Sequence, residues 1–132
     1  MEKQGGFHNY FSNIVNNNQR FKNLLNEKVE YQIVFMNAVQ YQASEGRKPL
    51  NKEVRDFNWI YFWAATGNNS FSRDLIKRIK KFPKESIIIN LCTFGDHNLQ
   101  NFVTLKLNYC KRAFFIGYHP CTWFYSCRRV IK

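Results

Sequence analysis

The chain has 132 residues, of which 45% are hydrophobic and 17% aromatic, and a formal net charge of +11. This length and apolar content predict one domain with a buried core over residues 1–132 and argue against a disordered tail. Residues 1–8 are expected to form a mobile N-terminus. No apolar run reaches the roughly 20 residues of a membrane span, and the N-terminus lacks a signal-peptide core. We therefore expect no membrane contact and an intracellular location, in the cytoplasm or nucleus, or in a host cell if the source is viral.

The positive charge is concentrated in the second half of the chain. Residues 1–72 hold eight Lys and Arg against six Asp and Glu, whereas residues 73–132 hold twelve against three. No acidic residue follows Asp96. A field of this sign favours partners that carry phosphate or other acidic groups.

The first half contains segments of opposite periodicity. Residues 9–27 place apolar side chains at helical spacing, although an Asn triplet interrupts them. Residues 29–42 begin by alternating apolar and polar side chains, which predicts a strand. Residues 51–66 fit a helix capped by Asn51, while residues 57–65 taken alone have the composition of an aromatic strand. We favour the helix.

The second half combines a basic helix with segments typical of strands. Residues 70–82 begin with Ser70 or Ser72 as the cap, repeat apolar side chains at helical spacing and end before Pro83, which predicts a helix. Residues 85–94 are β-branched and apolar, as in a central strand. Three further strands are expected in the segments FVTLKLNY, RAFFIGY and CTWFYSCRRVIK, joined as an antiparallel meander. The expected fold is therefore α+β: one compact domain with a mainly antiparallel sheet and two or three helices.

The helix predicted over residues 70–82 is the main candidate for a binding surface. It carries five cations and a single acid, Asp74, so pairing within the helix cannot neutralise it. Lys and Arg are common on solvated helix exteriors, which is the alternative interpretation. We favour phosphate contacts, the usual use of such an excess. The candidate nucleic-acid-binding residues are Arg73, Lys77, Arg78, Lys80, Lys81, Lys84, Lys111, Arg112, Trp123, Tyr125, Arg128 and Arg129.

Aromatic side chains offer a second mode of binding. If residues 57–65 formed a strand, four rings would share one face and could stack on bases. A buried core is the favoured interpretation there, because large aromatic side chains dominate protein interiors. Trp123 and Tyr125 share one face of the last expected strand with Arg129, which makes that strand the better candidate for stacking combined with phosphate contacts.

The four cysteines lie in the last third of the chain and include no CxxC pair. In a reducing compartment they would be thiols or metal ligands. Cys110, His119, Cys121 and Cys127 could hold a tetrahedral Zn²⁺ ion, but their spacing matches no familiar zinc motif. We therefore expect no cofactor, with zinc at these four residues as the alternative.

Catalysis would depend on the few histidines. His97 follows Asp96 in a turn after the expected central strand, a common position for active-site residues, and His119 precedes a proline. The nine acidic residues are scattered, which argues against the clustered carboxylates of a metal nuclease. No catalytic residue is assigned.

These patterns predict a non-enzymatic protein that binds RNA or DNA through its phosphates, with a viral or phage origin and a role against a host defence as a further expectation. A protein–protein inhibitor or adaptor, whose basic face binds an acidic partner surface, is the first alternative. A small hydrolase that uses His97 or His119 is the second. A homodimer is compatible with the sequence, and the choice between RNA and DNA or single strand and duplex stays open.

Overall fold

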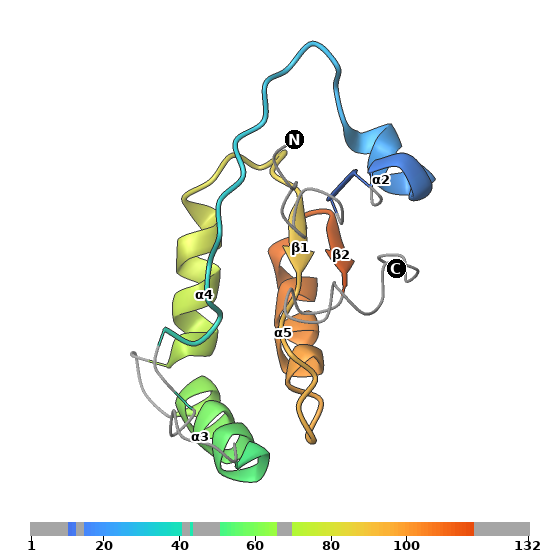
Figure 1. Cartoon of the computed structure of the whole chain (residues 1–132). Helices are drawn as coiled ribbons and strands as arrows, with labels where there is room; N and C mark the ends of the chain where they lie inside the picture. Colours follow the sequence, from blue (N-terminus) through green and yellow to red (C-terminus); the bar gives the residue numbers. More distant parts are fainter. Residues whose placement is uncertain (1–10, 13–14, 41–42, 44–50, 66–69, 118–132) are drawn as a thin grey trace, which may run out of the picture.

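The computed structural model describes residues 11–12, 15–40, 43, 51–65 and 70–117. Within these ranges the chain forms several helices and two short strands (Figure 1). After helical residues at 11–12 and 15–17, the elements are α2 (Gln19–Leu24), α3 (Lys52–Ala64), α4 (Phe71–Lys80), β1 (Ile88–Asn90), α5 (Leu99–Leu107), the 3₁₀ turn η1 (Asn108–Cys110) and β2 (Phe114–Ile116). None of the helices in the described ranges combines the length and the apolar composition needed to cross a bilayer.

The two strands are parallel and form one small sheet. Ile88 pairs with Phe114 and Asn90 with Ile116, and α5 lies between the strands in the chain as the crossover helix. The prediction of a mainly antiparallel sheet is therefore wrong. The segments 85–94 and 112–118 do contain strands, as expected, but they pair side by side in the same direction because the residues between them form a helix instead of a strand.

The helix α5 replaces the strand expected in FVTLKLNY because its buried residues follow a helical repeat. Leu99, Gln100, Val103 and Leu107 are buried, at offsets of one, four and eight. Val103 and Leu107 lie four residues apart, a spacing that suits both a strand face and a helix face. The two are distinguished by the burial of Leu99 and Gln100, which precede the alternating segment, and by Leu105, which a strand would bury with Val103 but which is 55% exposed.

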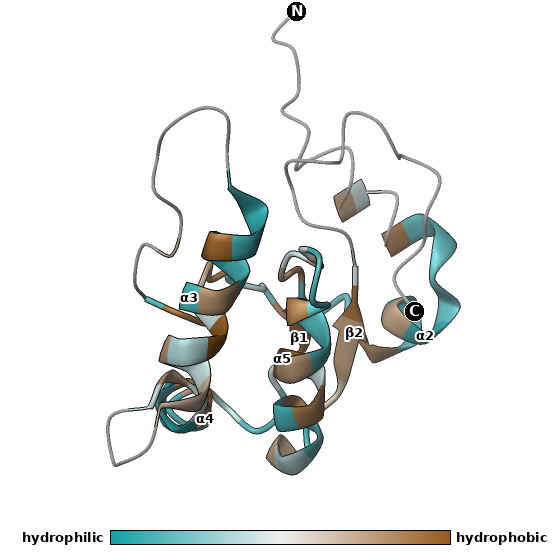
Figure 2. Cartoon of the chain, turned by 90° about the horizontal axis from the view of Figure 1, so that it is seen from below, coloured by the Kyte–Doolittle hydropathy of each residue, from teal (hydrophilic) through white to brown (hydrophobic). Residues whose placement is uncertain are grey.

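Apolar clusters lie on both faces of the sheet. The larger cluster joins α3, α4 and α5 through buried Val39, Trp59, Trp63, Leu75, Ile79, Leu99, Val103 and Leu107, and the strand residues Ile88 and Phe114 pack against it. On the other face, Phe21 of α2 packs against Phe115 of β2 with ring centroids 5.1 Å apart. In Figure 2, α3 and α4 lie at one side of the molecule, the strands and α5 lie in the middle, and α2 lies at the other side.

The helix α3 begins after its predicted cap, Asn51, and α4 begins after Ser70, one of its two candidate caps. The side chain of Asn51 accepts the backbone N–H of Val54, and that of Ser70 accepts the N–H of Arg73, so each satisfies a free N–H group of the first turn. The helix favoured for residues 51–66 is thus confirmed, as is the helix expected at residues 70–82. In α3 the helical turn brings Trp59 and Trp63 together as a stacked pair in the core.

Two predictions for the first half need correction. The expected helix over residues 9–27 is interrupted at Asn18, whose side chain accepts the N–H of Phe21 and caps α2. Residues 29–40 are not a strand: they have no sheet partner among the described residues and expose apolar side chains on both sides, such as Val34 and Phe35. In Figure 1 this segment runs alongside α4. An alternating pattern supports an extended backbone, but a strand also needs a hydrogen-bonded neighbour.

The last expected strand, CTWFYSCRRVIK, and the expected mobile N-terminus at residues 1–8 lie outside the described residues.

Candidate functional site

The exposed cations of α4 lie on one face of the helix, opposite its buried side. Leu75 and Ile79 are buried in the larger apolar cluster, whereas Lys77 and Lys80 are exposed. Arg73 near the start of the helix, and Lys81 and Lys84 beyond its end, extend this exposed face. We define the basic surface as Arg73, Lys77, Lys80, Lys81, Lys84, Lys106 and Lys111.

The segment after η1 is tied to the end of α4, and on that ground we include Lys106 and Lys111, which flank η1, in this surface. The guanidinium of Arg112 donates to the carbonyl oxygens of Ile79 and Phe82, the second at 2.9 Å. Burial raises the pKa of the Cys110 thiol, while the charges of Arg112, Lys80 and Lys106 act in the opposite direction. The charges of Lys80 in α4, Lys106 in α5 and Arg112 after η1 therefore all act on one half-buried thiol.

The candidate binding residues Arg78 and Arg112 have their donor groups engaged inside the protein. Arg78 is 15% exposed and donates from Nε to Asp74 at 2.7 Å, from Nη1 to the carbonyl of Asn37 at 2.9 Å and from Nη2 to that of Ala38 at 3.2 Å. Arg112 is half-buried with the two carbonyl contacts described above. Both residues hold the elements around the basic surface in place.

The other candidate residues divide into two groups. Arg73, Lys77, Lys80, Lys81, Lys84 and Lys111 are exposed in the structure. Trp123, Tyr125, Arg128 and Arg129 lie outside the described residues, as do His119, Cys121 and Cys127 of the alternative zinc site. Within the described ranges no group of three or more His, Cys, Asp and Glu side chains is arranged to hold a metal ion.

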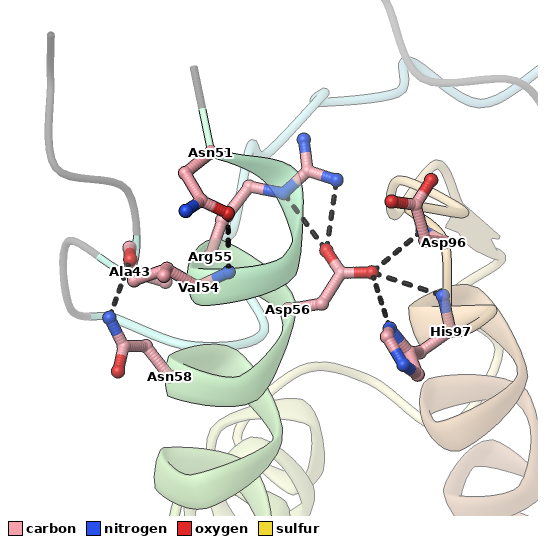
Figure 3. Close-up of polar contacts among 8 residues, drawn as sticks. All are labelled: Ala43, Asn51, Val54, Arg55, Asp56, Asn58, Asp96 and His97. Atoms are coloured by element: carbon pink, nitrogen blue, oxygen red, sulfur yellow. Dashed lines mark hydrogen bonds and ion pairs between the residues drawn. The ribbon is translucent and has the colours of Figure 1, made fainter. Parts of the chain in front are cut away.

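The second feature with chemical interest is a buried carboxylate on α3. The Asp56 side chain is fully buried and accepts five hydrogen bonds (Figure 3). Its Oδ1 accepts from Nε and Nη2 of Arg55, at 3.0 and 2.9 Å. Its Oδ2 accepts the backbone N–H of Asp96 at 2.7 Å and of His97 at 3.0 Å, and lies 3.3 Å from Nδ1 of His97. The carboxylate thus fastens the loop before α5 to α3.

The hydrogen bonds to Asp56 keep it ionised. Burial by itself raises the pKa of Asp56, but the donors from Arg55, His97 and Asp96 outweigh burial, and the net pKa lies below the ordinary value. A carboxylate can only accept, so Nδ1 of His97 must carry the proton in this contact. In a neutral His97 ring, Nε2 would then be the acceptor nitrogen.

The His97 side chain is accessible to solvent, as are Asp96 and part of Arg55. The side chain of His97 is 39% exposed, and its ring lies against Phe57 with centroids 5.1 Å apart. The nearby Cys92 does not supply a thiolate, because burial raises its pKa to about 11 and keeps it protonated at neutral pH. The arrangement can orient a histidine, and the described residues show no activated cysteine beside it.

Asp56 was not among the residues singled out from the sequence, although a signal was available. Residues 56, 59 and 63 fall on one helical stripe, and two of them are tryptophans that enter the core. An acidic residue on an otherwise aromatic stripe predicts a buried, hydrogen-bonded carboxylate. Its partners Asp96 and His97 lie about forty residues further along the chain and cannot be found from local spacing.

Comparison of the chain with protein-family models, with curated proteins and with solved structures finds no match.

Proposed function

We propose that the protein binds nucleic acid without catalysing a reaction, through contacts between the basic surface and backbone phosphates. The observation that carries this proposal is the exposed cationic face of α4, formed by Arg73, Lys77, Lys80 and Lys81 opposite the buried Leu75 and Ile79. Residues 70–117 hold nine Lys and Arg against three Asp and Glu. The acid on α4, Asp74, is engaged by Arg78, so it does not neutralise the exposed lysines.

The chemistry of these side chains favours phosphate over base recognition. Five of the six exposed candidate cations are lysines, whose ammonium groups are flexible point charges without the planar fork of arginine. Such contacts give affinity that falls with salt and carries little sequence information. The ligand class is therefore a polyanionic backbone, RNA or DNA.

The proposal is tested by reversing three lysines of the basic surface. In the variant Lys77→Glu, Lys80→Glu, Lys81→Glu, binding to labelled oligonucleotides at low salt should be lost, and any residual binding should show a salt slope smaller by about 3. The matched control is Lys22→Glu, Lys28→Glu, Lys52→Glu, three exposed lysines outside the basic surface. Each reversal removes two positive units, so both variants change from +11 to +5.

The two variants separate a local interface from a general charge effect. If both lose affinity equally, net charge and not the basic surface accounts for binding. If the wild-type protein retains no oligonucleotide at low salt, the proposal fails. An acidic protein partner is distinguished by competition, since random-sequence duplex should displace a nucleic-acid ligand and should not displace a specific protein.

A second candidate function is a hydrolase that uses His97, favoured by the contact between its Nδ1 and the buried Asp56. A carboxylate in this position fixes the ring and its tautomer, as a general base requires. The test is incubation of labelled RNA with the wild-type protein and with His97→Gln. Cleavage by the wild type that the variant lacks would support the hydrolase; intact RNA with both would exclude RNA cleavage by His97.

A further inference from the structure

Tyr109 is the most exposed large aromatic or aliphatic side chain in the described part of the chain, at 79%. It lies in η1, directly after α5 has buried Leu107 in the core. The ring is not packed in the core, so its flat apolar face is accessible to a ligand. Exposure alone does not mark a binding residue, because single exposed apolar side chains are common on protein surfaces.

The surroundings of Tyr109 distinguish it from the other exposed rings. Three cations lie within four residues of Tyr109 in the chain: Lys106, Lys111 and Arg112. The charge of Lys80 in α4 also acts to lower the pKa of the neighbouring Cys110 thiol. Tyr61, which is 71% exposed on α3, has no cation within four residues on either side. Tyr109 is thus an exposed ring at the edge of the basic surface, whereas Tyr61 is an exposed ring in a neutral stretch.

We propose that Tyr109 is a stacking platform for an unpaired base and that the ligand of the basic surface is single-stranded nucleic acid. This inference rests on the proposed function, because Lys80, Lys106 and Lys111 must hold the phosphates while the ring takes a base. The bases of a duplex are already stacked on one another, so a side-chain ring at the edge of a backbone-binding surface gains contact only with a strand whose bases are free. Stacking accepts any base, which agrees with phosphate contacts that read no sequence.

The test compares Tyr109→Ala and Tyr109→Phe with Tyr61→Ala as the matched control. The probes are a fluorescein-labelled oligothymidine strand and a duplex of the same length, measured by fluorescence anisotropy at two salt concentrations. Tyr109→Ala should weaken binding of the single strand by about 5- to 150-fold, the range for loss of one stacked base. Tyr109→Phe, which keeps the ring, should remain within about threefold of wild type, as should Tyr61→Ala.

The salt dependence separates stacking from phosphate binding. Tyr109→Ala should lower affinity for the single strand without changing the salt slope, while Lys106→Gln should reduce the slope by about 1. Duplex affinity should be equal in wild type and Tyr109→Ala.

The outcomes also separate this inference from the proposed function. If wild type binds the single strand in a salt-dependent manner but Tyr109→Ala binds equally well, the stacking inference is overturned and phosphate binding stands. An equal loss with Tyr61→Ala, or an equal loss on the duplex, overturns it as well. If wild type binds neither probe, the proposed function itself has failed.

Discussion

Gly95 lies directly against the carboxylate of Asp56. A Cβ atom added to Gly95 would be 2.7 Å from Cγ of Asp56 and closer still to both oxygens, and the φ of Gly95 is +57°. Gly95→Ala should therefore lower the free energy of unfolding by about 2–4 kcal/mol, from the left-handed backbone and from displacement of the carboxylate together. Urea unfolding measures the change.

Gly95→Asn separates the two causes of that loss. Asn tolerates a left-handed backbone but still carries a Cβ. If the close approach to Asp56 is limiting, Gly95→Asn is at least as unstable as Gly95→Ala. A Gly95→Asn protein as stable as wild type would show that the close approach does not matter.

Replacing Asp56 should change both the stability and its dependence on pH. Asp56→Asn cannot accept all five hydrogen bonds, and should cost about 2–4 kcal/mol at neutral pH. Because the folded-state pKa of Asp56 lies below the unfolded value of about 3.9, its contribution is complete above that value and is lost as the pH falls through the folded-state pKa. Unfolding at neutral pH and in acid should show the gap between wild type and Asp56→Asn narrowing in acid. A constant gap would contradict the ionised carboxylate.

Arg78 and Lys77 are neighbours in the chain with different expected roles. Arg78→Gln removes donors to the carbonyls of Asn37 and Ala38, and should lower the free energy of unfolding by about 1–3 kcal/mol and speed proteolysis within residues 29–40. Lys77→Gln should change stability by less than about 0.5 kcal/mol and weaken nucleic-acid binding instead. Arg78→Lys, which keeps the charge without the planar fork, should resemble Arg78→Gln. Equal stability of Arg78→Gln and wild type would rule out this anchoring role.

Gln100 joins the two strands from within the crossover helix. Its Nε2 donates to the carbonyl of Gly117 at 2.6 Å, of Cys92 at 3.2 Å and of Asn90 at 3.3 Å, and the side chain is buried. Gln100→Leu leaves these carbonyls without that donor and should cost about 2–4 kcal/mol. Gln19→Leu, at an exposed glutamine of α2, is the control and should be close to neutral. Unfolding curves of the two variants that coincide would contradict the role of Gln100.

The parts of the fold that the sequence determined are those with local causes. Asn51 and Ser70 satisfy N–H groups three residues away, so their helices begin where the caps predict. Leu75 and Ile79 lie one turn apart, which fixes the face of α4 that is buried and thereby the face on which the lysines are exposed. The exposure of Lys77, Lys80 and Lys81 follows from this spacing alone.

The tertiary structure decided everything that depends on a partner far along the chain. The four-residue step from Val103 to Leu107 suits a strand and a helix equally, and burial of Leu99 and Gln100 against the sheet selected the helix, which in turn made β1 and β2 parallel. Residues 29–40 had the pattern of a strand but found no neighbouring strand in the described chain. Likewise, Asp56 met His97 only because packing brought their elements together. Hydrogen bonds and electrostatic interactions join residues that are close in space, whereas sequence periodicity indicates only relations between residues a few positions apart.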